Sequence, residues 1–147
     1  PILADVGAAW AMPVGIDEFV SIQAGDHSVA ARAAALPGAD AIALTWRLFG
    51  NCGVIGFEDR PVTETFTRAA PEVMPWPWRA FMFKTLYRNS GAYRKLGVHR
   101  PRSPVAGKVD AMRWVDGEGR DLPPRFRKQG IFSPFGRPNY RLAHVNH

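Results

Sequence analysis

The sequence has little of what several classes of protein require. Cys52 is the only cysteine in 147 residues, which excludes an internal disulfide and a zinc cluster built from several cysteines. No apolar run approaches the roughly 20 residues that a membrane-spanning helix needs. Residues 1–5 contain neither an initiator methionine nor a signal-peptide pattern. We therefore expect a piece of a longer protein that works in a reducing, cytoplasmic compartment.

The composition is that of an ordinary globular domain. Hydrophobic residues make up 46% and charged residues 22% of the chain, and a chain of this length can bury one sizeable core. We expect a single domain over 1–147. The formal net charge of +6 suits a phosphate-bearing ligand, a nucleic acid, or peripheral association with an anionic membrane surface.

Helical and extended patterns alternate along the chain, which predicts an α/β fold with a mixed sheet and flanking helices. The clearest element is the nearly continuous apolar run 40–49, which favours a strand covered on both faces. Asp26 can cap a helix from about residue 27 to 36, and Pro61 suits the first turn of a second helix that reaches residue 69 or 70. Further strands are predicted at 8–12, 81–87, 112–115 and 140–145.

Asp17 and Glu18 follow the apolar segment 8–12 and precede Phe19. Two acids where a strand gives way to solvent are typical of metal and phosphate sites, because such sites need carboxylate oxygens on a stiff element beside a cleft. We expect Phe19 to anchor this turn in the core. The alternative, a strand end with two solvated acids, stays open at this point.

Several separate motifs resemble the bacterial family 2-like glycosyltransferases, which are related in pattern to family 92. The resemblance implies the GT-A fold, a nucleotide-diphosphate sugar donor, a hydroxyl acceptor, and a divalent metal bound through an Asp-x-Asp motif. It also implies a role in the synthesis of surface polysaccharides or glycoconjugates. The motifs are Asp-Glu-Phe at 17–19, Trp-Arg-Leu-Phe-Gly-Asn-Cys-Gly at 46–53, Val-Thr-Glu-Thr-Phe at 62–66, Phe-Lys-Thr at 83–85, Gly-Val-His-Arg-Pro at 97–101, and Val-Asn-His at 145–147.

The chain departs from the family pattern in two ways. Gly15 stands where the pattern has the first aspartate of Asp-x-Asp. The nucleotide-binding βαβ region, which would precede residue 1, is missing, and members usually continue past His147. The resemblance thus implies the C-terminal part of a GT-A-like nucleotide-diphospho-sugar transferase, truncated at both ends and inactive by itself. A catalytically silent glycosyltransferase-like binding domain is the main alternative.

The resemblance and the residue chemistry together suggest roles for particular side chains. Asp17 is the expected metal ligand because Mn²⁺ and Mg²⁺ favour carboxylate oxygen, and His147 is expected to complete the shell. Asp59 and Glu58, ahead of the second helix, are the candidates for the general base, although helix-capping acids would look the same. The residues expected to bind substrate are Glu18, Trp46, Arg47, Gly50, Gly53, Lys84, His99 and Arg100.

The order of the motifs also gives a geometric expectation. Asp17 and His147 should face one cleft, with His99 near its rim, although a lone histidine is often a hydrogen-bonded structural residue. Trp76 and Trp78 could stack on a sugar or pack within a loop. A basic nucleic-acid-binding module is the third class of function, but no known nucleic-acid-binding motif is present, so no nucleic-acid partner is expected.

Overall fold

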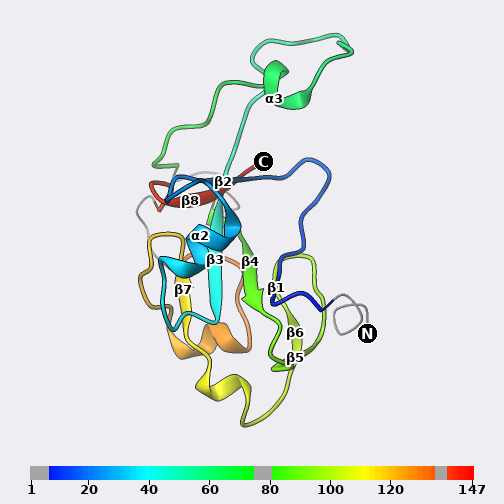
Figure 1. The fold of residues 1–147 in the computed structure, drawn as a ribbon. Helices are drawn as coiled ribbons and strands as arrows, with labels where there is room; N and C mark the ends of the chain where they lie inside the picture. The colour runs from blue at the N-terminus through cyan, green and yellow to red at the C-terminus, as the bar shows by residue number, and fades with distance from the viewer. Residues whose placement is uncertain (1–6, 75–80, 135–138) are drawn as a thin grey trace.

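A computed structural model describes residues 7–74, 81–134 and 139–147 of the chain. The protein is a mixed α/β structure with few helices and a curled, mixed sheet (Figure 1). Within the described residues the sheet has six strands in the order β1-β4-β3-β8-β2, and β7 also pairs with β3. The strands are β1 (Trp10–Ala11), β2 (Phe19–Ile22), β3 (Ala41–Arg47), β4 (Phe83–Arg88), β7 (Trp114–Asp116) and β8 (Ala143–Asn146).

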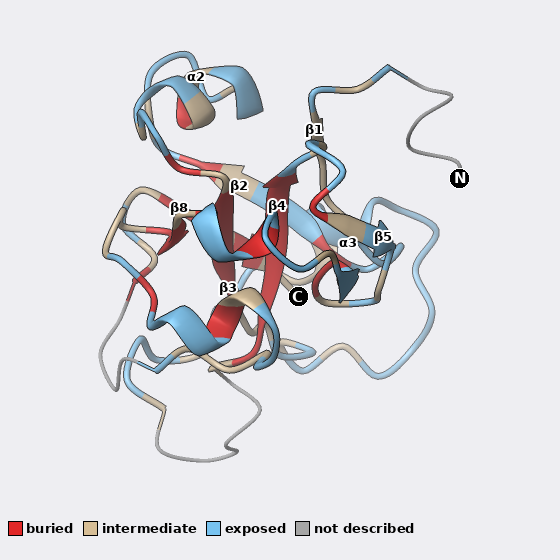
Figure 2. Cartoon of the chain, turned by 90° about the horizontal axis from the view of Figure 1, so that it is seen from below, coloured by how far each residue is buried: buried red, intermediate tan, exposed pale blue. Residues whose placement is uncertain are grey.

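Strand β3 is the centre of the sheet, and the predicted strand over 40–49 is confirmed. It pairs antiparallel with β4 on one side, whereas β7 and β8 both run parallel to it on the other. Its alternating side chains enter two separate apolar clusters, so both faces of the strand are covered (Figure 2). One cluster contains Ala41, Ala43, Phe83 and Trp114, and the other contains Ile42, Leu44, Val115 and Val145.

The first predicted helix is confirmed but shorter than expected. Helix α2 (Val29–Ala34) begins after Ser28, whose hydroxyl accepts a hydrogen bond from the Ala31 amide at 3.0 Å. Asp26 does not cap the helix directly. Its carboxylate accepts a hydrogen bond from the Ser28 amide at 3.1 Å instead, and so helps to orient the capping residue.

The second predicted helix is wrong in extent. Helix α3 (Val62–Thr65) has only four residues, and the chain is already extended at Phe66. The backbone of residues 68–70 forms its hydrogen bonds with residues 48–50, so these groups have partners without a longer helix. The excursion that contains α3 projects beyond the end of the sheet where the C-terminus lies (Figure 1).

Several short elements at the opposite end of the domain were not predicted from the sequence. Strands β5 (Tyr93–Lys95) and β6 (Arg102–Pro104) form a separate antiparallel pair. Two 3₁₀ turns, η2 (Val109–Ala111) and η3 (Pro124–Arg127), add Val109 and Phe126 to the cluster around Trp114. Trp76 and Trp78 lie outside the described residues. None of the described helices is both long and apolar enough to cross a membrane.

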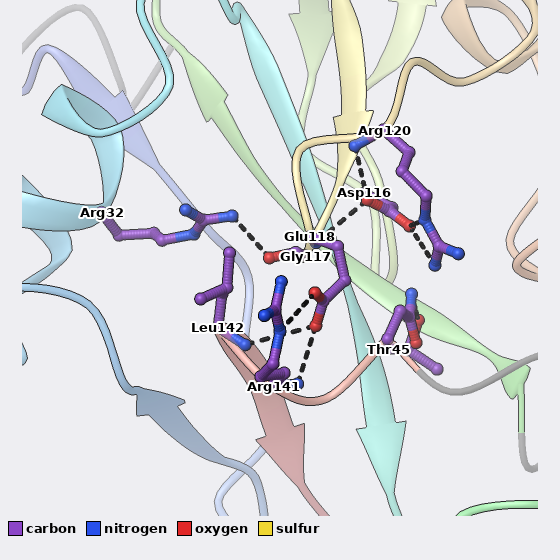
Figure 3. Close-up of polar contacts among 9 residues, drawn as sticks. Arg32, Thr45, Asp116, Gly117, Glu118, Arg120, Arg141 and Leu142 are labelled. Atoms are coloured by element: carbon purple, nitrogen blue, oxygen red, sulfur yellow. Dashed lines mark hydrogen bonds and ion pairs between the residues drawn. The ribbon is translucent and has the colours of Figure 1, made fainter.

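A polar turn after β7 ties three parts of the fold together (Figure 3). Arg32, from α2, donates a hydrogen bond to the Gly117 carbonyl oxygen. The Glu118 carboxylate accepts hydrogen bonds from the backbone amides of Arg141 and Leu142, at 2.8 and 3.3 Å. Because these two residues directly precede β8, the turn fixes where β8 enters the sheet.

Candidate functional site

The strand directions bring four distant segments to one end of the sheet. Strands β3 and β8 are parallel, so their carboxyl ends meet there. Strands β2 and β4 run antiparallel to β8 and β3, so they begin at the same end. The residues gathered in this way are Asp17, Glu18, Trp46, Lys84 and His147. The acids therefore precede a strand, whereas the sequence analysis expected them to end one.

Asp17 and His147 form the exposed part of this cluster. The Asp17 Oδ2 atom lies 3.6 Å from the Nδ1 atom of His147, as the geometric prediction expected. This Nδ1 atom is buried and has no hydrogen-bond partner within the described residues. The backbone of His147 is held at both ends, since its amide donates to the Arg47 carbonyl oxygen and its own carbonyl oxygen accepts from the Phe49 amide. The imidazole ring is thus fixed beside a carboxylate.

The Trp46 indole supports the His147 ring from one side. The two rings are stacked, with centroids 4.2 Å apart and planes inclined by 27°. His99 lies on the indole as well, at 5.3 Å and a tilt of 58°, so it is near the pair as expected. Burial and the nearby charge of Lys84 lower the pKa of His99, which keeps this imidazole neutral at pH 7.

Glu18 and Lys84 form a buried ion pair behind these residues. Their charged atoms are 3.0 Å apart, and the two side chains are 2% and 4% exposed. The Glu18 carboxylate also accepts from the Trp46 indole nitrogen at 2.8 Å, and Lys84 donates to the Val98 carbonyl oxygen at 2.6 Å. Burial favours the neutral acid and is the largest influence on the pKa of Glu18, but the hydrogen bonds together lower it. Glu18 therefore remains ionised.

The burial of this pair changes the roles expected for Glu18 and Lys84. Their polar atoms are occupied by protein groups, which does not fit direct contact with a substrate. They are better placed to hold the turn that carries Asp17 and the loop that carries His99. Phe19 also differs from expectation, because its side chain is 37% exposed and is not part of the core.

Gly15 lies where the turn wraps around Glu18. Its amide donates a short hydrogen bond to the Glu18 carboxylate. A Cβ atom at this position would lie 2.7 Å from Asp17 Oδ1 and 3.2 Å from Glu18 Oε2. Because the Asp17 side chain is 65% exposed, it could turn away from a larger residue at position 15, but it would then leave its place beside His147.

Two cavities meet at His147. The first, which we call the Asp17 cavity, has a volume of about 440 Å³ and is bounded by Asp17, Phe19, Phe49, Gly50, Asn51, Val62, Thr63, Phe66, Asn146 and His147. The second, the Trp46 cavity, has a volume of about 630 Å³ and is bounded by Trp46, Leu48, Met82, His99, Ile131, Phe132 and His147. Both volumes are in the range of small-molecule sites.

The other predicted site residues are spread around this centre. Arg47 lies 3.8 Å from Glu72 and 4.9 Å from the centre of the Tyr140 ring, and it borders a different hollow. Gly53 adopts a left-handed φ of +81° in the turn after Gly50. Arg100 is buried against Trp114 on another part of the domain.

Glu58 and Asp59 are exposed on the excursion ahead of α3. Glu58 pairs with Arg60 at 2.8 Å, and neither acid borders the Asp17 cavity. Phe66, by contrast, does border it, together with Val62 from the same predicted helix face. The sequence indicated that these two apolar side chains act together, but nothing in it showed that they face the acids at 17 and 18.

The arrangement can offer two protein ligands to a divalent cation. No group of three or more histidine, cysteine or acidic side chains that could hold a metal occurs in the described part of the chain. A carboxylate oxygen and an imidazole nitrogen 3.6 Å apart can still bind one cation, because bonds to Mg²⁺ are about 2.1 Å long and Mg²⁺ often takes its other ligands from phosphates and water. The orphaned Nδ1 atom of His147 fits this use.

No protein-family model, curated protein sequence or solved structure matches this chain.

Proposed function

We propose that this domain is the C-terminal part of a GT-A-like glycosyltransferase that moves a sugar from a nucleotide diphosphate to a hydroxyl acceptor. The observation that carries the proposal is the pairing of Asp17 with the otherwise unpartnered Nδ1 atom of His147, 3.6 Å away, at the meeting point of two cavities. These residues come from opposite ends of the chain. They were also the two metal ligands that the family resemblance implied.

In this proposal Asp17 and His147 hold Mn²⁺ or Mg²⁺. The cation would offset the negative charge that develops on the departing diphosphate. Trp46 keeps the His147 imidazole in position by stacking, and the Glu18–Lys84 pair holds the turn beneath Asp17. Phe49 and Phe66 contribute apolar surface to the Asp17 cavity.

The transfer breaks the bond between the anomeric carbon and a diphosphate oxygen, and the bonding pair leaves with the diphosphate. A new bond forms between that carbon and the acceptor oxygen, whose proton passes to a general base. Asp59 and Glu58 stay our prediction for the base. They lie on the same excursion that supplies Val62 and Phe66 to the Asp17 cavity, so acceptor binding there would bring the hydroxyl to this segment.

Metal binding can be measured without any enzymatic activity. We would titrate the chain with Mn²⁺ and follow the electron paramagnetic resonance signal of the free ion. Asp17→Asn and His147→Gln should each weaken binding by more than the roughly tenfold loss that a change behind a ligand can cause. The matched control is Asp121→Asn, because Asp121 is 69% exposed and pairs only with Arg113 at the surface. Equal Mn²⁺ affinity in all four proteins would refute the site.

Gly15 favours a second candidate, a catalytically silent glycosyltransferase-like binding domain, because it leaves the turn with one fewer carboxylate. The variant Gly15→Asp distinguishes a site that has lost a carboxylate ligand at position 15 from a site that needs only Asp17 and His147. If the site needs only Asp17 and His147, Gly15→Asp should weaken Mn²⁺ binding by displacing Asp17, and Gly15→Ala should do so through its Cβ alone. Stronger binding by Gly15→Asp would indicate a degenerate site. A longer parent protein that folds but neither transfers nor hydrolyses nucleotide sugars would support the silent domain.

A further inference from the structure

Arg100 is buried and has no carboxylate partner among the described residues. The residue is 7% exposed. Its Nε and Nη1 atoms donate long hydrogen bonds to the carbonyl oxygens of Pro101 and Gly130, at 3.4 and 3.2 Å, whereas Nη2 has no partner. Buried arginines are normally paired, because an ion that loses its hydration is destabilised unless an opposite charge compensates it.

The Trp114 ring offsets part of this cost. The guanidinium carbon lies 4.8 Å from the centre of the indole, and such a cation–π contact is strongest when it is shielded from water. Burial nevertheless lowers the pKa of Arg100. The Tyr93 hydroxyl group raises this pKa, and the nearby charge of Arg102 lowers it further. The surroundings of Arg100 thus favour an additional negative charge.

Arg100 borders a cavity of about 660 Å³, which we call the Arg100 cavity. Arg102, Ser103, Lys128 and Gln129 also border it, and the set of bordering residues contains no acid. Arg102 and Lys128 are exposed, so they are free to turn toward a ligand at little cost. Lys128 has a surface partner in Asp110 at 3.0 Å, and an exposed ion pair of this kind is weak enough to exchange for a ligand.

The loop that carries Arg100 and Arg102 is held in place by contacts at Val98 and at Gly97. Lys84 donates a hydrogen bond to the Val98 carbonyl oxygen at one end of the loop. The aliphatic stem of Arg102 lies against Gly97, where a Cβ atom would be 2.7 Å from its Cγ atom. Ser103 has a left-handed φ of +55° at the other end. The backbone of the loop that carries Arg100 and Arg102 is therefore held by the fold before any ligand arrives, whereas the exposed end of the Arg102 side chain can still turn.

We propose that the Arg100 cavity binds a phosphate group, with Arg100 at its floor and Arg102 and Lys128 at its mouth. A phosphate offers several acceptor oxygens to the planar, forked donors of arginine, and such charge-assisted hydrogen bonds are about twice as strong as neutral ones. The cavity shares no bordering residue with the Asp17 cavity; His99 and Ile131 border both it and the Trp46 cavity, but Arg100, Arg102 and Lys128 border neither of those two. The proposal therefore does not rest on sugar transfer.

The test is calorimetric titration of the chain with inorganic phosphate and with pyrophosphate, at fixed ionic strength. We expect Arg102→Gln to weaken binding about tenfold, which corresponds to about 1.4 kcal/mol. Arg100→Gln should weaken phosphate binding more than Arg102→Gln does. Because Arg100 is buried, its variant could fail to fold. Arg102 is exposed, so Arg102→Gln tests the proposal in that case as well. Arg68→Gln is the matched control, because Arg68 is an exposed arginine on the excursion near α3, and its affinity should equal that of the wild type.

Two further comparisons identify the site and the source of the phosphate. Asp17→Asn should bind phosphate as the wild type does, whereas a loss in this variant would assign binding to the Asp17 cavity and overturn the proposal. A second arm uses vesicles that contain phosphatidic acid. Arg102-dependent binding to vesicles and not to free phosphate would identify a lipid headgroup as the source. Failure to bind in both arms, or equal binding by Arg102→Gln and Arg68→Gln, would overturn the proposal.

Discussion

The buried pair of Glu18 and Lys84 should make a large, mutually dependent contribution to stability. We consider a double-mutant cycle with Glu18→Gln, Lys84→Met and the combination of both. Each single change leaves one charge buried among groups arranged for its partner. In Glu18→Gln, for example, the Lys84 ammonium would keep neutral acceptors such as the Val98 carbonyl oxygen but would lose the carboxylate charge that balances its own.

The magnitude follows from the geometry. At a separation of 3.0 Å, Coulomb's law with an effective dielectric constant of about 20 gives an attraction of about 5–6 kcal/mol. Part of this attraction offsets the desolvation of two side chains that are almost fully buried. Removal of one member of such a pair typically costs about 3–5 kcal/mol, and we expect each single variant to fall in this range. The double variant should cost clearly less than the two single variants together, because neither charge is then left unpaired.

The assay is urea unfolding followed by tryptophan fluorescence, with the free energy of unfolding extrapolated to zero denaturant. Arg113→Gln provides a control, since the Arg113–Asp121 pair has a shorter distance of 2.7 Å but its side chains are 42% and 69% exposed. Such a surface pair should contribute about 1 kcal/mol or less. Single variants of Glu18 and Lys84 that each lose less than the control, or strictly additive effects, would refute the reasoning.

Three further predictions concern other parts of the fold. Gly117→Ala should destabilise the domain by about 1–3 kcal/mol in the same urea assay, because its Cβ atom would collide with the Ala143 carbonyl oxygen; unchanged stability would show that the turn can relax. Ser28→Ala should cost about 1 kcal/mol through loss of the α2 cap, and circular dichroism should show the helical signal melting earlier. Burial lowers the pKa of His144 from its ordinary value near 6.5, and the charge of Arg47 adds to this against hydrogen bonds to Tyr140 and Asn146. As the pH falls, the unfolded chain therefore protonates His144 before the folded chain does. The contribution of His144 to the free energy of unfolding is complete above about pH 6.5 and falls as the pH drops below that value. In a His144→Gln variant, the free energy of unfolding should decline less steeply with falling pH.

The central part of the fold was predictable because local pattern and tertiary environment agree there. The run from Ala41 to Arg47 is apolar on both of its faces, and the structure buries both faces. The α2 helix is short, but its small residues and its cap favour a helix locally, and the fold has a helix at the same place. In both cases the sequence signal and the packing favour the same conformation.

The failures occur where long-range hydrogen bonds decide the conformation. Residues 66–70 have a plausible helical pattern, yet their backbone pairs with residues 48–50, and no local signal reports that partnership. Asp17 and Glu18 were expected at the end of a strand, but the chain turns tightly at Gly15 and begins β2 after the acids. The residue types at the site could be named from the sequence, whereas the direction of the strand that carries them could not.

The distance between Asp17 and His147 depends on two anchors that lie away from both residues. Asp17 is positioned by a turn that closes around the Glu18 carboxylate, which Lys84 holds in the interior. His147 is positioned by β8, whose entry into the sheet is fixed by Glu118 in the polar turn after β7. The Glu18–Lys84 pair is buried, so removal of either partner should be costly, whereas Glu118 acts mainly through its hydrogen bonds with the backbone amides of Arg141 and Leu142. The two anchors together keep Asp17 and His147 close to each other although they lie far apart in the sequence.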